Sequence, residues 1–295
     1  MANHDVGSVT ELWRFPVKSM AGEQLEEAAF ADQGVLGDRA YGLIDAETNK
    51  VVSGKSTKLF PGILDCRATF LEPPQLGQDL PPIRISLADG SSITSDSADI
   101  DKALSSFFKR PVSLARVAPD DYTIDQYHPD IEHLDPQDHR DTVVEQPLGS
   151  ALFAAVGQPS PVATGAFFDL FPISVITTST LARLRELAPT STVDSRRFRM
   201  NVVVATQEPG FLENDWVGQT LALDDVQLAV ALPDPRCVMT TLRQDNLAHD
   251  AEILRTLARH NRIQVGDIGL FPCAGVYAVV AAHGSVRPGS TVILS

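Results

Sequence analysis

The nine residues Pro233-Asp234-Pro235-Arg236-Cys237-Val238-Met239-Thr240-Thr241 guide our interpretation of the whole chain. Two prolines fix φ and push the residues before them out of the helical region, so the stretch predicts a stiff, extended approach to Cys237. Arg236 favours a thiolate on its neighbour, and the thiolate is the form that binds a metal or attacks a substrate. A cysteine that only packs in the core is the commoner case, and the stretch alone leaves both interpretations open. The composition of 238–241 predicts a return to a strand.

The overall composition predicts a globular protein and opposes two classes of partner. The chain has 295 residues, 43% of them hydrophobic and 21% charged, which suits one large or two medium domains. Its formal net charge is −14, so we expect neither nucleic acid nor an anionic membrane surface as a partner. The sequence shows no signal peptide and no apolar run long enough to span a membrane. We therefore expect a cytoplasmic protein.

Several common kinds of site lack support in the sequence. The three cysteines, Cys66, Cys237 and Cys273, form no C-x-x-C pair. This odd and scattered set argues against a disulfide framework or a zinc site and fits a reducing compartment. Neither G-x-G-x-x-G nor the Walker pattern occurs, so nothing supports a Rossmann dinucleotide site or a P-loop.

Residues 1–117 carry the pattern of a β-rich domain. Short apolar and alternating runs predict strands, the first of which ends near Pro16, where a proline is tolerated. The first helical periodicity comes at 100–108, where Ile100, Leu104 and Phe108 fall on one face. We expect a closed or half-closed sheet, that is a β-barrel-like domain, with one appended helix. The predicted strands are 9–17, 25–30, 40–44, 50–53, 63–71, 83–87 and 92–94.

Residues 118–150 differ sharply in composition. Between 118 and 146 there are nine acidic residues and one basic residue, Arg140. His128, His133 and His139 are interleaved with them, but their spacings of five and six match no familiar metal-ligand pattern. Like charges at this density favour an extended, hydrated segment. We interpret the segment as an acidic connector between two halves of the chain, which could also form a lid.

Residues 151–295 predict a second β-rich domain with a few helices. Three hydroxyl residues at 178–180 predict an N-terminal cap for a helix at 181–187, and a second helix is expected at 250–262. The predicted strands are 173–177, 202–205, 216–221, 226–231 and 275–280, with a final hairpin at 284–294. The whole chain is therefore expected to be mixed α+β and mainly β.

A basic cluster stands out in this acidic chain. Arg196, Arg197 and Arg199 lie directly before the predicted strand at 202–205. Such a cluster needs an anionic partner, either acidic side chains on a neighbouring segment or a bound phosphate. Salt bridges are common and individually weak, so the residues alone leave both alternatives open.

An ordered set of motifs resembles the MOSC family with its associated N-terminal β-barrel domain, and within it the group of amidoxime-reducing components. Each motif is weak by itself, and their common order is what makes the resemblance specific. It covers most of the chain outside the acidic connector. The motifs are FPVKSMAG (15–22), GVLGDRAYGLID (34–45), DLFPISVIT (169–177), FRMNVVV (198–204), WVGQTLAL (216–223), PRCVMTT (235–241), GVYAVV (275–280) and GSVRPGS (284–290).

The resemblance implies a molybdenum cofactor, Mo-molybdopterin, held between the two halves. In proteins of this kind the cysteine of the Arg-Cys pair supplies a thiolate to molybdenum beside two dithiolene sulfurs of the pterin, and Cys237 stands in that position. A soft thiolate suits a metal that is already bound by sulfur. By the same matching, the pterin and its phosphate would be held by Lys18, Ser19, Arg39, Asp169, Arg199, Asn201, Arg236 and Tyr277.

The implied activity is that of a molybdenum-dependent oxidoreductase, without a need for pyridoxal phosphate. A small N-hydroxylated substrate would be reduced by two electrons and its oxygen would leave as water, with Cys237 as catalytic residue and metal ligand. No ferredoxin-like cysteine set follows the last predicted hairpin, so the electrons would come from a separate ferredoxin, flavoprotein or cytochrome. The sequence indicates no convincing general acid, and solvent could deliver the protons.

Two other functions would use the same features. MOSC domains also resemble the C-terminal part of molybdenum cofactor sulfurases, so Cys237 could carry sulfur as a persulfide. A non-catalytic protein that binds or stores the cofactor is the third alternative.

Overall fold

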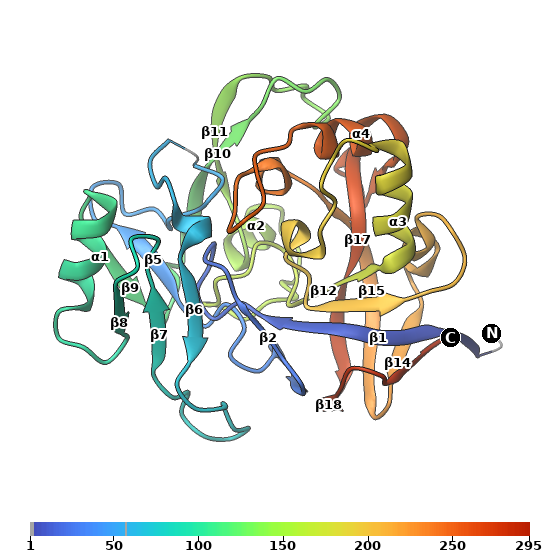
Figure 1. Cartoon of the computed structure of the whole chain (residues 1–295), viewed down its shortest axis with the longest axis horizontal. Helices are drawn as coiled ribbons and strands as arrows, with labels where there is room; N and C mark the ends of the chain where they lie inside the picture. The colour runs from blue at the N-terminus through green and yellow to red at the C-terminus, as the bar shows by residue number, and fades with distance from the viewer. Residues whose placement is uncertain (1–2, 57) are drawn as a thin grey trace.

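The largest sheet of the protein closes into a barrel of seven strands (Figure 1). The computed structural model describes residues 3–56 and 58–295. β12 and β13 are parallel neighbours, all other pairs around the barrel are antiparallel, and β12 pairs with β17 to close it. In order around the barrel the strands are β12 (Ile173–Thr177), β13 (Val202–Ala205), β1 (His4–Arg14), β19 (Thr291–Leu294), β14 (Thr220–Leu223), β15 (Val226–Pro235) and β17 (Gly269–Ala282).

The barrel forms because its strands are rich in β-branched residues that pack on a pleated surface. β13 reads Val-Val-Val-Ala, and β12 reads Ile-Ser-Val-Ile-Thr with all five residues buried. Side chains from every strand meet in one core, to which Trp216 adds a large ring from outside the strands. Two short strands extend the sheet: β2 (Glu23–Gln24) pairs with β1, and β16 (Arg262–Val265) pairs with β17.

The first strand of the chain belongs to this barrel and not to the sheets of its own half. β1 pairs with β13 on one side and with β19 on the other, and it runs across the molecule in Figure 1. The regions 1–117 and 151–295 therefore share a strand. The domain boundaries at 117 and 150 stay a prediction.

The other strands of the first half contribute to three small sheets, of which two lie in the left-hand lobe of Figure 1 and the third also takes a strand from the second half. In that lobe α1 (Ile100–Phe108) packs Leu104 and Phe108 into a second core, at the residues predicted for a helix. The expected strand at 50–53 is wrong, since only a bridge between Ile44 and Val51 forms there, and 63–71 begins as a 3-10 turn. The sheets are β5 (Gly42–Asp45) with β9 (Val112–Ala115), β6 (Arg67–Phe70) with β7 (Ile83–Ser86) and β8 (Ser92–Thr94), and β18 (Gly284–Val286) with β3 (Ala28–Ala31) and β4 (Gly34–Val35).

The acidic segment is folded, which corrects the expectation of an extended, hydrated connector. β10 (Thr123–His128) and β11 (Thr142–Pro147) form an antiparallel hairpin at the top of Figure 1. Its loop buries Ile131 and Leu134 against α4 (Glu252–His260). Apolar residues spaced through the acidic run therefore outweigh the mutual repulsion of its charges.

The remaining helices flank the barrel. α3 (Thr178–Leu187) begins earlier than predicted, because the side chain of Thr177 accepts the backbone N–H of Thr180 and so caps it. α2 (Ser150–Ala155) follows the hairpin. The expectation of a mainly β chain with a few flanking helices is confirmed. None of the helices in the described part of the chain combines the length and apolarity needed to cross a bilayer.

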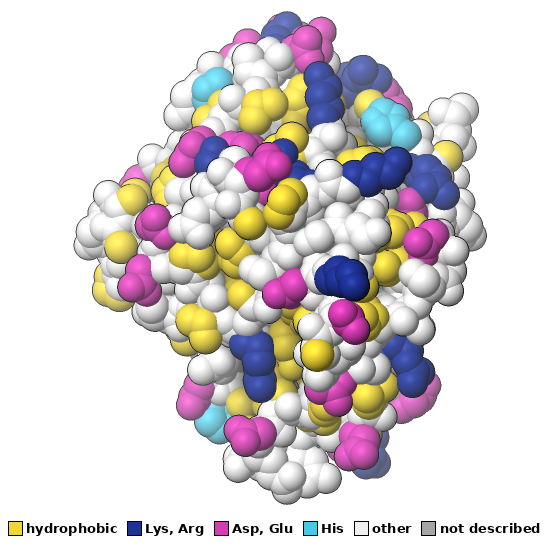
Figure 2. All heavy atoms as spheres, turned by 90° about the vertical axis from the view of Figure 1, so that its left-hand side faces the viewer, with side chains coloured by type: hydrophobic (Ala, Val, Ile, Leu, Met, Phe, Trp, Pro, Cys, Tyr) yellow, Lys and Arg dark blue, Asp and Glu magenta, His cyan; other side chains and the backbone are white. Residues whose placement is uncertain are grey.

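Charged side chains of both signs are interspersed with hydrophobic ones on the face shown in Figure 2. Of the described residues on this face, Lys and Arg stand beside Asp and Glu and do not merge into one basic field.

A chain that begins at residue 118 should fail to fold, because without β1 the edges of β13 and β19 stay unpaired. Circular dichroism melts of 118–295 and of the full chain test this expectation. As a control, the full chain nicked between 117 and 118 keeps β1 and should retain its cooperative melt. A cooperative melt of 118–295 within a few degrees of the full chain would contradict the shared-strand architecture.

Candidate functional site

Cys237 follows directly on the end of a barrel strand. β15 ends at Pro235, and Cys237 is extended with φ of −124° and ψ of −174°. The backbone N–H of Arg236 donates to the carbonyl of Pro272 at 2.8 Å, which ties this turn to β17. The extended approach predicted from the prolines is therefore observed. The strand predicted at 238–241 is wrong, because these buried residues form a 3-10 turn that begins directly after Cys237.

A cavity of about 450 Å³ opens beside Cys237, which is half-buried. It is lined by the first half of the chain, the barrel and the β10–β11 hairpin. All nine residues predicted for the site line this one cavity, and their roles stay a prediction. They are Lys18, Ser19, Arg39, Asp169, Arg199, Asn201, Arg236, Cys237 and Tyr277.

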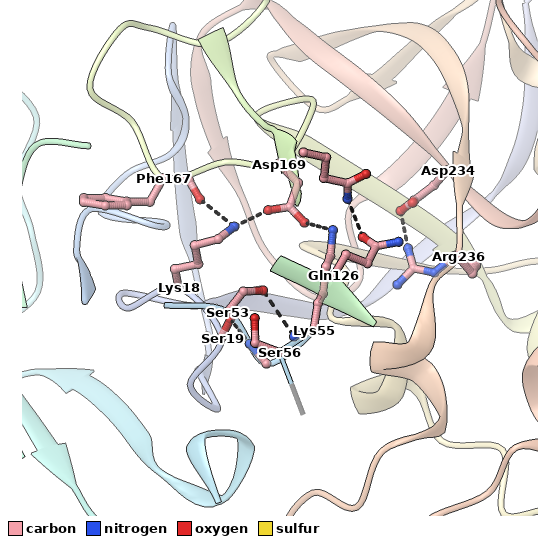
Figure 3. Close-up of polar contacts among 12 residues, drawn as sticks. Lys18, Ser19, Ser53, Lys55, Ser56, Gln126, Phe167, Asp169, Asp234 and Arg236 are labelled. Carbon is pink, nitrogen blue, oxygen red and sulfur yellow. Dashed lines mark hydrogen bonds and ion pairs between the residues drawn. The ribbon is translucent and has the colours of Figure 1, made fainter. Parts of the chain in front are cut away.

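An ion triad of two buried lysines and a partly exposed aspartate lies in the cavity wall (Figure 3). One oxygen of Asp169 pairs with the ammonium of Lys18, and the other lies 2.8 Å from the ammonium of Lys55. Lys18 also donates to the carbonyl of Phe167 at 3.3 Å. The two lysines come from the first half of the chain and Asp169 from the second, so the triad joins the two halves at the cavity.

The triad shifts the pKa of each of its members. Burial lowers the pKa of Lys18 to about 8, because desolvation exceeds the attraction of Asp169. Burial would raise the pKa of Asp169, but the two lysines hold it well below its usual range. Burial opposes the charge of Lys55 as well, yet Asp169 and then Cys237 raise its pKa. The thiol of Cys237 therefore lies within electrostatic reach of a fixed ammonium.

A second polar network positions the arginines from the two halves. Asp38 accepts the backbone N–H of Phe15 at 2.7 Å and the amide of Asn201 at 2.9 Å, and it pairs with Arg39. Arg39 also donates to the carbonyl of Arg199 at 3.1 Å. Both guanidinium groups lie against the ring of Phe15, at 4.5 Å and 4.4 Å from its centre.

Arg199 differs from the other cations of the cavity because its charge lacks a counterpart. Among the described residues, no carboxylate lies within 4.0 Å of its guanidinium and no hydrogen bond from it is formed. Burial, followed by repulsion from Arg39, lowers its pKa to about 9. A cation of this kind is available to an anionic ligand.

Backbone strain gathers at the cavity. Ten described residues other than glycine have a positive φ, and six of them are Asn, Asp or His, which tolerate this conformation. Of the other four, Ser19, Arg39 and Arg199 line the cavity, with φ of 67°, 47° and 55°. Strained backbone that the surroundings hold in place is a feature of functional sites.

Asp234 and Arg236 form a buried pair beside Cys237. Burial raises the pKa of Asp234 to about 6, against the pull of Arg236. Burial also raises the pKa of Tyr277 well above its usual value, and the charge of Asp234 adds to that rise. One oxygen of Asp234 and the Nε of Arg236 are buried without a hydrogen-bond partner among the described residues. Because the hydroxyl of Tyr277 lies close to Asp234, the Nε of Arg236 is the atom left for a ligand or for water.

The three arginines of the basic cluster have three different roles. One of them pairs with acidic side chains, as the first alternative predicted, and another stays available to an anionic ligand, as the second alternative predicted. Arg196 pairs with Asp194 and Asp245. The buried Arg197 donates to backbone carbonyls, among them that of Ala248 at 2.7 Å. Only the third member of the cluster, Arg199, lines the cavity.

Sequence reasoning missed Lys55 and the cavity-facing residues of the hairpin. Lys55 follows Gly54, where an added Cβ would lie 2.8 Å from the sulfur of Met239. The glycine lets this loop approach the Cys237 turn. A Gly-Lys pair after a β-like run was therefore the sequence signal that could have indicated Lys55 as a site residue. The hairpin residues in the cavity wall are Gln126, His128, Leu134, Asp135, Gln137, His139, Val144, Gln146 and Pro147. The charge pattern of this segment predicted solvent exposure and did not indicate that its residues line a cavity.

Comparison with known proteins assigns the chain to a family. The MOSC domain matches residues 164–293, and the MOSC N-terminal beta barrel domain matches residues 6–106. Together the two matches span most of the chain, which belongs to the MOSC domain family.

Two curated relatives align with nearly the whole chain. Mitochondrial amidoxime-reducing component 1 of Homo sapiens is 24% identical over 98% of this chain and 83% of its own length. The protein of the same name from Mus musculus is 26% identical over 98% of this chain and 82% of its own length. Among solved structures, the YUAD protein from Bacillus subtilis covers 99% of this chain and 97% of its own at 10% identity, with a TM-score of 0.43.

Only Cys237 of the three cysteines should react with iodoacetamide in the native protein. Cys66 and Cys273 are fully buried, and burial raises the pKa of both thiols, to about 11 for Cys66. Peptide mass spectrometry after brief alkylation measures the pattern, and alkylation in urea, where all three should react, is the control. Modification of Cys66 or Cys273 as fast as Cys237 would show that the accessible thiol is misassigned.

Proposed function

We propose that the protein is a molybdenum-cofactor-dependent oxidoreductase that reduces small N-hydroxylated compounds, with Cys237 as the protein ligand to molybdenum. The observation that carries the proposal is the convergence of all nine predicted residues, from both halves of the chain, on one cavity. Membership of the MOSC family and the similarity to two amidoxime-reducing components also support this proposal.

The residues of the cavity fit an anionic, sulfur-rich cofactor. The charge of Arg199 lacks a counterpart, and the buried Nε of Arg236 lacks a hydrogen-bond partner among the described residues. A phosphate would satisfy both through charge-assisted hydrogen bonds. Cys237 offers a soft thiolate ligand at the same cavity, beside cations that favour its ionised form.

In this proposal each group of residues has its own task. Arg39, Arg199 and Arg236 bind the phosphate and the polar edge of the pterin, together with Ser19, Asn201 and Tyr277. Lys18 and Asp169 orient the pterin, and Lys55 keeps the Asp169 carboxylate ionised. When bound, the cofactor supplies the two-electron redox chemistry. The electrons come from a separate ferredoxin, flavoprotein or cytochrome, and the cytoplasmic location stays a prediction.

A sulfur carrier is the second candidate function. The half-buried Cys237 with Lys55 and Arg236 nearby would also suit a persulfide, because neighbouring cations stabilise a sulfur anion. A storage protein would bind the cofactor without turnover. Persulfide without molybdenum indicates the carrier, whereas molybdenum without reduction of benzamidoxime by an artificial electron donor indicates storage.

Protein produced in cells that make the cofactor should contain near-stoichiometric molybdenum and reduce benzamidoxime. Cys237→Ala should lose the metal, and Arg199→Ala and Arg236→Ala should weaken cofactor binding about tenfold or more, since each loses a charge-assisted hydrogen bond. Molybdenum content by mass spectrometry and thermal melts are the measurements.

Arg196→Ala is the matched control, because Arg196 belongs to the same cluster but pairs with Asp194 and Asp245. It should keep the molybdenum content of the wild type. Equal molybdenum content in the Arg199→Ala, Arg236→Ala and Arg196→Ala variants would refute the phosphate assignment. An absence of molybdenum in the wild type would refute the proposed function.

A further inference from the structure

The β10–β11 hairpin places a buried histidine in the cavity wall. His128 is the last residue of β10 and is 6% exposed. Its place is fixed by the backbone, because Tyr127 donates to the carbonyl of Lys55 at 3.0 Å and Val51 donates to that of Thr123 at 3.1 Å. His128 therefore stands beside the segment that carries Lys55, and Lys55 in turn lies within electrostatic reach of Cys237.

A chain of hydrogen bonds orients the ring of His128. Its Nδ1 lies 3.0 Å from Oδ2 of Asp135, and the Nδ1 of His139 lies 3.1 Å from Oδ1 of the same carboxylate. On the other side, Gln146 donates to Oε1 of Gln126 at 2.6 Å, which leaves the amide nitrogen of Gln126 to donate to Nε2 of His128 at 3.3 Å. The resting ring is thus neutral, with its proton on Nδ1 and a lone pair on Nε2.

This arrangement is typical of an acid–base histidine held by a carboxylate. Protonation at Nε2 would break the contact with Gln126, because two donors would then face each other, and would free this N–H for a ligand in the cavity. Gln126 and His128 both line that cavity. The half-buried His139 connects the same carboxylate to the protein surface.

Burial keeps His128 neutral at pH 7, and the charged groups around the ring act in both directions. Burial lowers its pKa, with smaller contributions in the same direction from His139 and Lys55, and Asp135 opposes them. Lys18 and Lys55 are engaged by Asp169, and Tyr277 holds its proton tightly. Asp234 titrates near pH 6 but is 1% exposed and paired with Arg236.

We propose that His128 is the proton donor for reduction of the N-hydroxylated substrate, with Asp135 and His139 as positioning residues. The inference rests on the proposed function. The N–O bond breaks as two electrons arrive from the electron-donor protein, the Nε2–H of His128 protonates the leaving oxygen, and solvent supplies the second proton. The products are the reduced nitrogen compound and water, and His128 regains its proton through solvent.

The first test is the pH dependence of kcat for benzamidoxime with an artificial electron donor. Because the donor must be protonated, kcat should fall as pH rises above the pKa of His128. His128→Gln should lower kcat about 10²-fold and abolish this limb without changing molybdenum content. His139→Gln removes a repelling charge, so it should move the limb to higher pH. His133→Asn, an exposed change in the same loop at a φ that Asn tolerates, is the matched control and should behave as wild type.

The second test needs no turnover. Imidazole NMR titration of the cofactor-free protein should give His128 a pKa below its ordinary value of about 6.5, and a higher pKa in the His139→Gln variant. A third test measures turnover again: Asp135→Asn should lower kcat while retaining molybdenum, because an amide cannot hold the same tautomer.

The outcomes separate the two proposals. A wild type without molybdenum or without turnover refutes the proposed function and this inference together. A wild type that turns over, with kcat and pH limb unchanged in His128→Gln, refutes this inference alone. Loss of the limb in Asp234→Asn but not in His128→Gln would also overturn it. Stoichiometric zinc bound to the wild type and lost from His139→Gln would also overturn this inference, because the three side chains would then form a metal site. The donor atoms of His128, Asp135 and His139 lie within 4.8 Å of one another.

Discussion

The ion triad of Lys18, Asp169 and Lys55 is the constraint around which the site is built. A carboxylate in the contact between two lobes would be costly if it were unpaired, and here each of its oxygens faces an ammonium group. The triad therefore fixes the two halves of the chain against each other at the cavity. Because one carboxylate meets two lysines, it also leaves an excess of positive charge there. Together with the uncompensated Arg199, this excess favours an anionic ligand in a protein that is otherwise strongly acidic.

The fold divides the work among three parts. The barrel is rigid because it closes on itself, and it places Cys237 immediately after the end of β15. The first half contributes β1 to the barrel and the cations Lys18, Arg39 and Lys55 to the cavity, and its residues Ser19 and Arg39 adopt a strained backbone there. The hairpin forms the third wall and brings the two histidines of the lining, His128 and His139, which the other two walls lack. A cofactor held by all three parts would also tie them together.

Local patterns in the sequence predicted those features that depend on neighbouring residues. The helix at 100–108 was found from its periodicity, and the extended approach to Cys237 from its prolines. Local patterns failed where contacts between residues far apart in the sequence decide the structure. The strand expected at 238–241 becomes a 3-10 turn in a buried position, and the acidic run folds because Ile131 and Leu134 reach α4.

The site itself could be assembled only through the family resemblance, because its contacts join residues far apart in the chain. Lys18 and Asp169 are separated by 151 positions, and no periodicity or spacing connects them. Lys55 and His128 belong to none of the family motifs that we used. They became visible only when the structure placed them in the same wall as Cys237.

X-ray absorption at the molybdenum edge tests the central claim most directly, because it counts the sulfur atoms around the metal in the loaded protein. The account predicts three sulfur neighbours in the wild type, one of them the thiolate of Cys237, and two in the Cys237→Ser variant, whose hydroxyl can keep part of the metal. The same sulfur count in both proteins would contradict the account, as would a wild type in which molybdenum has no sulfur ligand from the chain.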